Sequence, residues 1–205
     1  MLIGILHSLI GICRKKTERF NKMKLRDLSK MQGPNNGTRT LNESIMIPEI
    51  IAAIKDWMSS KAGGVLIGGL ALSNWAKPRM TQDIDVLYLH DSDIPDHVNK
   101  FKKTREHSFQ HNSTHVEVET VSSEFLNLPE DVVQKIIDTA INQNGIKVAS
   151  PSGIVASKLY RFNMRDQADI VDLINSQPVD ISDFNLPEDK VERFRNMVEI
   201  AAKEK

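Results

Sequence analysis

Two aspartates that stand two positions apart are the first feature of the sequence that could do chemistry. Asp83 and Asp85 flank Ile84 at the start of a predicted strand, Asp83 to Leu89. Strand residues i and i+2 share a face, so both carboxylates point to one place while Ile84 enters the core. Two carboxylates about 4 Å apart repel by about 4 kcal/mol at an effective dielectric of about 20, so a cation or water must screen them. Such oxygen ligands suit Mg²⁺ (or Mn²⁺), which also binds substrate phosphates. A similar pair on a surface turn would have no function, so the neighbouring residues must decide.

Residues suited to phosphate binding surround this pair. Gly68 and Gly69 follow a short apolar strand, Val65-Leu66-Ile67, and precede a predicted helix. A glycine pair lets backbone N–H groups approach a phosphate, and the start of the helix adds partial positive charge. Arg79 adds a cation and Thr81 a hydroxyl near the strand start. The alternative is a tight strand-to-helix turn without a ligand, but the Arg-x-Thr-x-Asp-x-Asp pattern favours a nucleotide site.

A third carboxylate is expected from a neighbouring strand. The segment HVEVETV, residues 115–121, alternates apolar and polar residues as a half-buried strand does, which puts Glu117 and Glu119 on one face. One of them completes the metal site, and the other is equally compatible with a solvated rim position. An acid in this place can bind metal and can also accept the proton of an attacking hydroxyl.

The elements that must position these residues follow from periodicity and turn signals. An α/β or α+β fold is predicted, with a small mixed β-sheet flanked by helices and a helical C-terminal part. Ser150 is the expected cap of one helix, and Asn144-Gly145 is expected to close the helix before it. The basic cluster from Lys100 to Arg105 falls in another predicted helix, as a solvated face or a contact to an RNA backbone. Helices are predicted at about 45–58, 70–76, 93–107, 129–141, 152–162, 167–174 and 190–202, and strands at 65–67, 83–89, 115–121 and 146–149.

Composition sets the broad class. The chain has 205 residues, 40% of them hydrophobic, and a single cysteine, Cys13, which excludes a disulfide framework and a cysteine-based zinc site. A reducing, cytoplasmic location is expected. His107, His111 and His115 recur every fourth residue, but the residues between them indicate a loop that enters a strand, which disfavours zinc.

The charges divide the chain unevenly. Residues 1–40 carry nine Lys/Arg and two Asp/Glu, so the remainder carries 18 and 25. We expect a flexible basic extension over 1–40, a catalytic core over 41–150 and a helical part over 151–205 that packs on the core. The basic arm could instead touch nucleic acid, an anionic membrane or the acidic body. The apolar run of residues 1–13 is too short to span a bilayer, so no stable membrane insertion is expected.

Three blocks of the sequence together resemble a known family. GVLIGGLALSNWAKPRMTQDIDVLYL (64–89) resembles the nucleotidyltransferase superfamily of DNA polymerase β type, whose signature is Gly-Gly or Gly-Ser, Arg-Ser/Thr, then Asp-x-Asp. VEVETVSSEF (116–125) resembles the strand that carries the third acid. VASPSGIVASKLYRFNMRDQADIVDLI (148–174) resembles a later segment of the minimal, abortive-infection (AbiEii-like toxin) group, in which a Lys precedes Asp-x-x-Asp. The resemblance covers about residues 45–176.

The resemblance implies roles for individual residues. Gly68 and Gly69 would hold the triphosphate, and Asp83 and Asp85 the metals. Glu119 best matches the third acid, with Glu117 as the alternative; the family has Asp at this place. Lys158 would meet the triphosphate, while Asp166 and Asp169 would have structural or tuning roles, and Asn163 stands where the family has an Arg.

The resemblance also implies a reaction. A nucleoside monophosphate would pass from a nucleoside triphosphate such as ATP to an acceptor hydroxyl on RNA (for example tRNA), a protein or a small molecule, with pyrophosphate as the leaving group. A toxin would have an antitoxin protein as its partner. Two alternatives are an adenylyltransferase for an aminoglycoside-type antibiotic and a nucleotide-binding regulatory module in which the Glu substitution has weakened catalysis.

Overall fold

A mixed sheet of seven strands forms the centre of the described chain. The computed structural model describes residues 41–60, 62–76, 81 and 83–204, with side chains from residue 48; the predicted extension 1–40 and Arg79 lie outside this range. The strand order is β3-β4-β5-β2-β1-β7-β6, in which β2–β5 and β1–β7 are parallel and the other pairs antiparallel. The strands are β1 (Val65–Ile67), β2 (Ile84–Leu87), β3 (Phe101–Arg105), β4 (Ser108–His111), β5 (Glu117–Val121), β6 (Ile141–Gln143) and β7 (Ile146–Val148).

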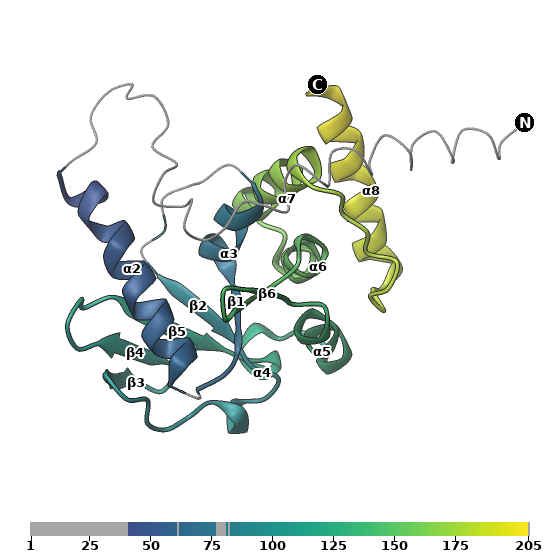
Figure 1. Ribbon diagram of the computed structural model, residues 1–205. Coiled ribbons are helices and arrows are strands. Elements are labelled where there is room, and N and C mark those ends of the chain that lie inside the picture. The colour runs from purple at the N-terminus through teal and green to yellow at the C-terminus, as the bar shows by residue number, and fades with distance from the viewer. Residues whose placement is uncertain (1–40, 61, 77–80, 82, 205) are drawn as a thin grey trace, which may run out of the picture.

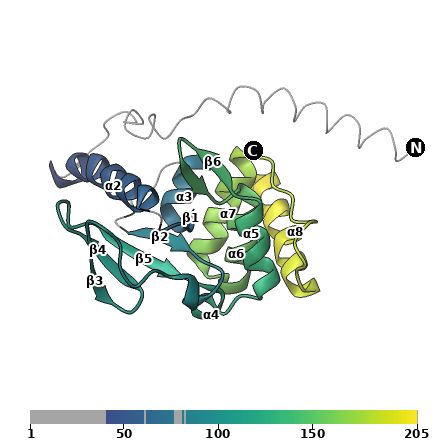
Figure 2. The same cartoon turned by 60° about the horizontal axis from the view of Figure 1, so that its bottom comes forward.

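Helices pack on one face of this sheet and beyond one of its ends. They are α2 (Leu41–Ser59), α3 (Gly68–Trp75), α4 (Ser123–Leu126), α5 (Glu130–Asp138), α6 (Pro151–Arg161), α7 (Met164–Ser176) and α8 (Glu188–Lys203). Helix α2 lies over the β2, β5 and β4 strands, whereas α5 to α8 gather beyond the other end (Figures 1 and 2). The predicted fold class, a small mixed sheet flanked by helices, is confirmed. None of the described helices is long and apolar enough to cross a membrane.

An aromatic cluster fixes α2 on one face of the sheet. The fully buried Trp57 packs edge-on against Phe101 and Phe109, with ring centroids 5.0 and 5.1 Å apart. At the end of the helix, the hydroxyl of Tyr88 donates to the carbonyl oxygen of Ala62 at 2.8 Å. Because neighbours in a strand alternate between faces, β2 turns Val86 toward α2 and leaves Asp85 for the opposite face.

The helix predicted over 93–107 is wrong. A short 3₁₀ turn (Asp91–Asp93) and the antiparallel β3–β4 hairpin occupy this segment. Val98 and Phe101 stand three residues apart, as on one face of a helix. Both are buried in the core, but Val98 precedes β3 and Phe101 is its first residue. The cluster from Lys100 to Arg105 therefore lies on an edge strand, because β3 is the last strand of the sheet.

The structure also corrects the role of Asn144-Gly145. These residues have φ values of 54° and 86° and join β6 to β7 as a hairpin turn, instead of closing a helix. The predicted cap Ser150 is confirmed, since its Oγ accepts the N–H of Gly153 at 3.1 Å. Helix α3 begins at Gly68, two residues before the predicted start, and α7 begins at Met164, three residues before.

Candidate functional site

The turn from β1 into α3 is shaped around Asp85. Gly68 has φ +71°, a conformation that side chains with a β-carbon rarely adopt, and a β-carbon there would lie 1.8 Å from Oδ2 of Asp85. The next N–H, that of Gly69, donates a hydrogen bond to the Asp85 carboxylate. The two glycines thus hold Asp85 at the N-terminus of α3, whose N-cap, Ile67, offers no side-chain hydrogen bond. The phosphate-binding role of both glycines stays a prediction.

The parallel pairing of β2 with β5 brings the carboxylates together. Asp85 lies directly opposite Glu119, so the register selects Glu119 over Glu117 as the neighbour of Asp85. Burial is the main cause that raises the pKa of Asp85 from 3.8 to about 6, and the charges of Glu119 and Asp83 raise it further. The Gly69 N–H and the charge of Lys158 oppose this rise. Bound cations would relieve the same repulsion.

A cavity of about 750 Å³ opens beside these groups. Its acidic wall contains Gly68, Gly69, Thr81, Asp83 and Asp85, and its cationic wall contains Lys158, Arg161, Arg165 and Lys190 from α6, α7 and α8. Of these cations, only Lys158 was predicted to bind nucleotide, because Arg161 and Arg165 lie in the third block without matching its pattern and Lys190 lies outside the three blocks. Apolar side chains, including Phe125, Leu128 and Tyr160, complete the lining. Carboxylates and cations in the lining of one cavity of this size suit a metal-bound, anionic ligand of nucleotide dimensions.

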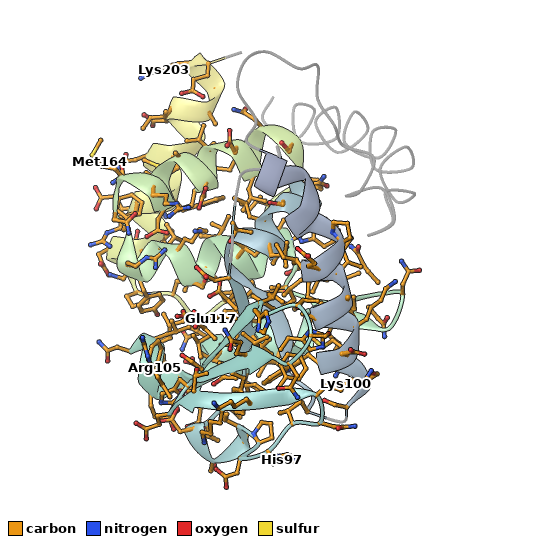
Figure 3. The ribbon with its side chains drawn as sticks, turned by 90° about the vertical axis from the view of Figure 1, so that its left-hand side faces the viewer. His97, Lys100, Arg105, Glu117, Met164 and Lys203 are labelled. Carbon is orange, nitrogen blue, oxygen red and sulfur yellow. The ribbon has the colours of Figure 1, made fainter. Side chains whose placement is uncertain are left out.

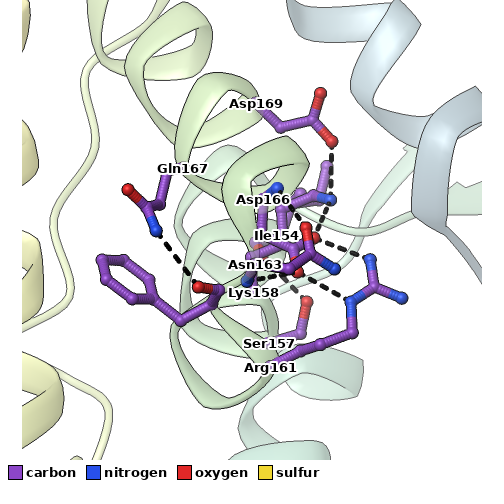
Figure 4. A network of polar contacts seen from close by, with 9 residues as sticks. Ile154, Ser157, Lys158, Arg161, Asn163, Asp166, Gln167 and Asp169 are labelled. Atoms are coloured by element: carbon purple, nitrogen blue, oxygen red, sulfur yellow. Dashed lines mark hydrogen bonds and ion pairs between the residues drawn. The ribbon is translucent and has the colours of Figure 1, made fainter.

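Lys158 is buried in a network of ion pairs. Its Nζ lies 3.0 Å from Oδ1 of Asp166 and 2.7 Å from Oδ2 of Asp169 (Figure 4). Arg161 adds a bidentate pair to Asp166, Nε–Oδ2 at 2.7 Å and NH2–Oδ1 at 2.6 Å. Burial alone would raise the pKa of Asp166, but the hydrogen bonds from Arg161 and Lys158 hold it at about 2. Lys158 is therefore neither a solvated helix lysine nor an isolated cation.

A capping box orients this network. Oδ1 of Asn163 accepts the N–H of Asp166 at 2.9 Å, and Oδ2 of Asp166 accepts the N–H of Asn163 at 3.3 Å. Asp166 thus caps the first turn of α7 and holds Lys158 and Arg161 at the same time. Asn163, which stands where the resembled family has an Arg, is the N-cap residue of α7. The three-residue spacing between Asn163 and Asp166 is the sequence pattern that indicates such a capping box.

The donor set fits a hard divalent cation. Asp83, Asp85 and Glu119 offer only oxygen ligands, and Gly68 leaves room for the Asp85 carboxylate that a β-carbon would fill. Among the described residues, no group of three or more His, Cys, Asp or Glu side chains lies close enough together to hold a metal ion without further ligands. Mg²⁺ does not need such a group, because it usually takes one or two carboxylates and completes its shell with phosphates and water.

The histidines that recur at 107, 111 and 115 do not converge. Both ring nitrogens of His111 are engaged, Nε2 with Asp56 at 3.1 Å and Nδ1 with Thr114 at 2.7 Å. This histidine fastens β4 to α2.

Residues 46–199 match a family described as "Nucleotidyltransferase of unknown function (DUF6036)". The chain belongs to this family. In this member of the nucleotidyltransferase family, the matched region contains all the candidate site residues, from Gly68 to Lys190. No curated protein matches the chain.

Two solved structures from Helicobacter pylori are also similar to the chain. One is JHP933, with 14% identity and a TM-score of 0.38 over 82% of this chain and 94% of the other. The second, which has been proposed to be a nucleotidyltransferase, has 13% identity and a TM-score of 0.38 over 81% of this chain and 97% of the other.

Proposed function

We propose that the protein transfers a nucleoside monophosphate from a nucleoside triphosphate to an acceptor hydroxyl, with Mg²⁺ or Mn²⁺ as the cofactor. The single observation that carries this is the pairing of Asp85, which lines the cavity beside the Gly68 turn, with Glu119 on the neighbouring strand, while four cations line the same cavity. The charge of Glu119 raises the pKa of Asp85, a bound cation would relieve this repulsion, and the cationic wall offers the partners that a triphosphate needs.

The carboxylates have distinct parts in the reaction. Asp83, Asp85 and Glu119 would hold the metal, which supplies charge neutralisation of the phosphates. The acceptor oxygen attacks the α-phosphorus, a new P–O bond forms, and the bond to the β-phosphate breaks as pyrophosphate leaves. Glu119 faces water at the open side of the pair and accepts the proton of the acceptor hydroxyl.

The cationic wall binds and orients the triphosphate. Arg161, Arg165 and Lys190 line the same cavity as the acids and supply positive charge for the β- and γ-phosphates. Lys158 contributes through its network: it holds Asp166 and Asp169, and its charge acts on Asp85. Gly68, Gly69 and Thr81 would contact the phosphates from the acidic side.

The proposal also covers the class of acceptor and the biological role of the protein. The acceptor is RNA such as tRNA, a protein or a small molecule, and the AbiEii-like resemblance of the Lys158 segment favours a cytoplasmic toxin with an antitoxin partner. An aminoglycoside-type antibiotic would be an acceptor of the small-molecule class.

Label transfer tests this function. The purified protein with Mg²⁺ and each α-labelled nucleoside triphosphate is offered total RNA, cell protein and small-molecule extract separately. Transfer by the wild type and by Asp172→Ala, which removes an exposed carboxylate on α7, but not by Asp83→Ala/Asp85→Ala, would support the proposal.

A regulatory module is the second candidate. The observation that favours it is that Asp166 and Asp169 already balance the charge of Lys158. Metal-dependent triphosphate binding by the wild type without transfer to any of the three acceptor pools would select this alternative.

A further inference from the structure

The sheet continues past the carboxylates as an open face. Residues in register across neighbouring strands form two rows on this face. The first row contains Asp85, Glu119, Ser108 and Arg105, and the second contains Glu117, Gln110 and Lys102. Apart from Asp85, these residues belong to β5, β4 and β3. Four of their side chains are exposed: those of Glu117, Glu119, Lys102 and Arg105. Figure 3 shows Glu117 and Arg105 on the side of the sheet away from α2, and Lys100 beside the end of α2. We call this surface the β5–β3 face.

The cations in β3 and directly before it have different partners on the two faces of the sheet. On the α2 side, Lys100 pairs with Asp56 at 2.8 Å and Lys103 with Asp96 at 3.2 Å. On the β5–β3 face, Lys102 and Arg105 form no ion pair with a described residue. Three strand spacings separate Arg105 from Asp85, about 14 Å. The face therefore runs from acids at the reaction centre to unpaired cations at the sheet edge.

An exposed aromatic ring lies between the cavity and this edge. Phe125 lines the cavity, is 56% exposed, and its ring centroid lies 5.0 Å from that of His107 in the β3–β4 turn. An aromatic ring left open to water next to a cationic strand is the combination that single-stranded nucleic acids bind, since bases stack on the ring and phosphates meet the cations.

We propose that the β5–β3 face binds the acceptor, and that the acceptor is the end of a single-stranded RNA. Its reacting hydroxyl lies at Asp85 and Glu119, a nearby base stacks on Phe125, and the following phosphates meet Arg105 and Lys102. The distance of about 14 Å from Asp85 to Arg105 exceeds the reach of a single sugar or amino acid side chain. A duplex is disfavoured, because its bases are not free to stack on Phe125. This inference rests on the proposed function for the identity of the reaction at Asp85.

Salt-dependent RNA binding tests the cations. The probe is a fluorescent single-stranded RNA of about 12 nucleotides, titrated in Mg²⁺ without triphosphate at several KCl concentrations. The variant Lys102→Ala/Arg105→Ala should bind more weakly, and the slope of log K against log salt should flatten by about 1.4, or about 0.7 for each lost phosphate contact. The control Lys55→Ala/Lys147→Ala removes two exposed lysines from α2 and β7 and should keep the wild-type slope. Equal losses in both double variants, or no loss in the first, would overturn the inference.

Phe125→Ala tests the stacking step. It should weaken RNA binding about tenfold, with the salt slope unchanged, because stacking does not release counterions. Loss of triphosphate binding with unchanged RNA binding would move Phe125 into the nucleotide site and contradict this step.

Triphosphate binding, measured with a fluorescent nucleotide and Mg²⁺, separates this inference from the proposed function. Wild-type protein that transfers nucleotide to a protein or small molecule, and binds no RNA, would overturn the inference and keep the function. Wild-type protein that binds RNA through Lys102 and Arg105 but neither binds nor transfers nucleotide would overturn the function and keep the β5–β3 face as an RNA site.

Discussion

The carboxylate of Asp85 occupies the space next to Gly68 that a β-carbon would need, since that carbon would lie 1.8 Å from Asp85 Oδ2. Gly68→Ala should therefore displace Asp85 in addition to straining the backbone. Gly63 offers a matched control, because its φ is +70° and nothing lies within 4 Å of a β-carbon built there. Both alanine variants should lose about 1 to 2 kcal/mol of unfolding free energy from the positive φ, but only Gly68→Ala should lose more and also lose triphosphate binding. Urea denaturation and nucleotide titration measure both effects; equal behaviour of the two variants would contradict the Gly68–Asp85 contact.

Stability should depend on pH through Asp85. Its pKa rises from 3.8 to about 6 in the folded protein, chiefly through burial, so the unfolded chain releases this proton at lower pH than the folded one. The contribution of the protonated carboxyl is fully present below pH 3.8 and is lost as pH rises through about 6. In EDTA, Asp85→Asn should be more stable than the wild type at pH 8, by about 3 kcal/mol at most, with no difference near pH 3.5. Thermal unfolding across this pH range checks the prediction, and a constant difference at all pH values would contradict it.

Lys158 should be the most costly cation of the site to remove. Lys158→Met leaves the buried Asp166 and Asp169 without their shared partner and should cost about 3 to 5 kcal/mol. The side chain of Arg161 is 66% exposed, so Arg161→Met should cost about 1 kcal/mol. Urea denaturation of the two variants decides the order, and the reverse order would contradict the assignment of Lys158 as the centre of the network.

The register of β5 predicts different effects for its two glutamates. Glu119→Gln should lower the transfer rate at saturating triphosphate by at least about 100-fold, because Glu119 lies opposite Asp85. Glu117→Gln makes the same chemical change two residues away and should keep the rate within a few-fold. A larger loss in Glu117→Gln would show that the wrong acid has been assigned.

The sequence motifs of the candidate site could be recognised because they are local. Gly68-Gly69 follows the short, wholly apolar strand β1, and Asp83 and Asp85 flank Ile84 at the start of β2, so both motifs can be recognised from a few residues. The choice between Glu117 and Glu119 could not be made in this way, since both share a face. It depends on the register between β2 and β5, which only the folded sheet supplies.

The missed elements have a common physical reason. In β3 only Phe101 is buried and the next four residues are exposed, so the strand lacks the alternation by which a half-buried strand is recognised. The strand β6 is likewise exposed or half-buried throughout, and its turn, Asn144-Gly145, is typical of helix ends as well as hairpins. Lys158 was ambiguous because its partners, Asp166 and Asp169, lie on the next helix.

The fate of the two ends of the triphosphate tests the central claim most directly. The protein is incubated with Mg²⁺ and the acceptor pool that takes label, using α-labelled and γ-labelled triphosphate in parallel. The proposed reaction predicts that the α label enters the acceptor and the γ label appears as pyrophosphate, and that Asp83→Ala/Asp85→Ala abolishes both. Label from the γ position in the acceptor, or equal transfer by the variant, would contradict nucleotidyl transfer at this site.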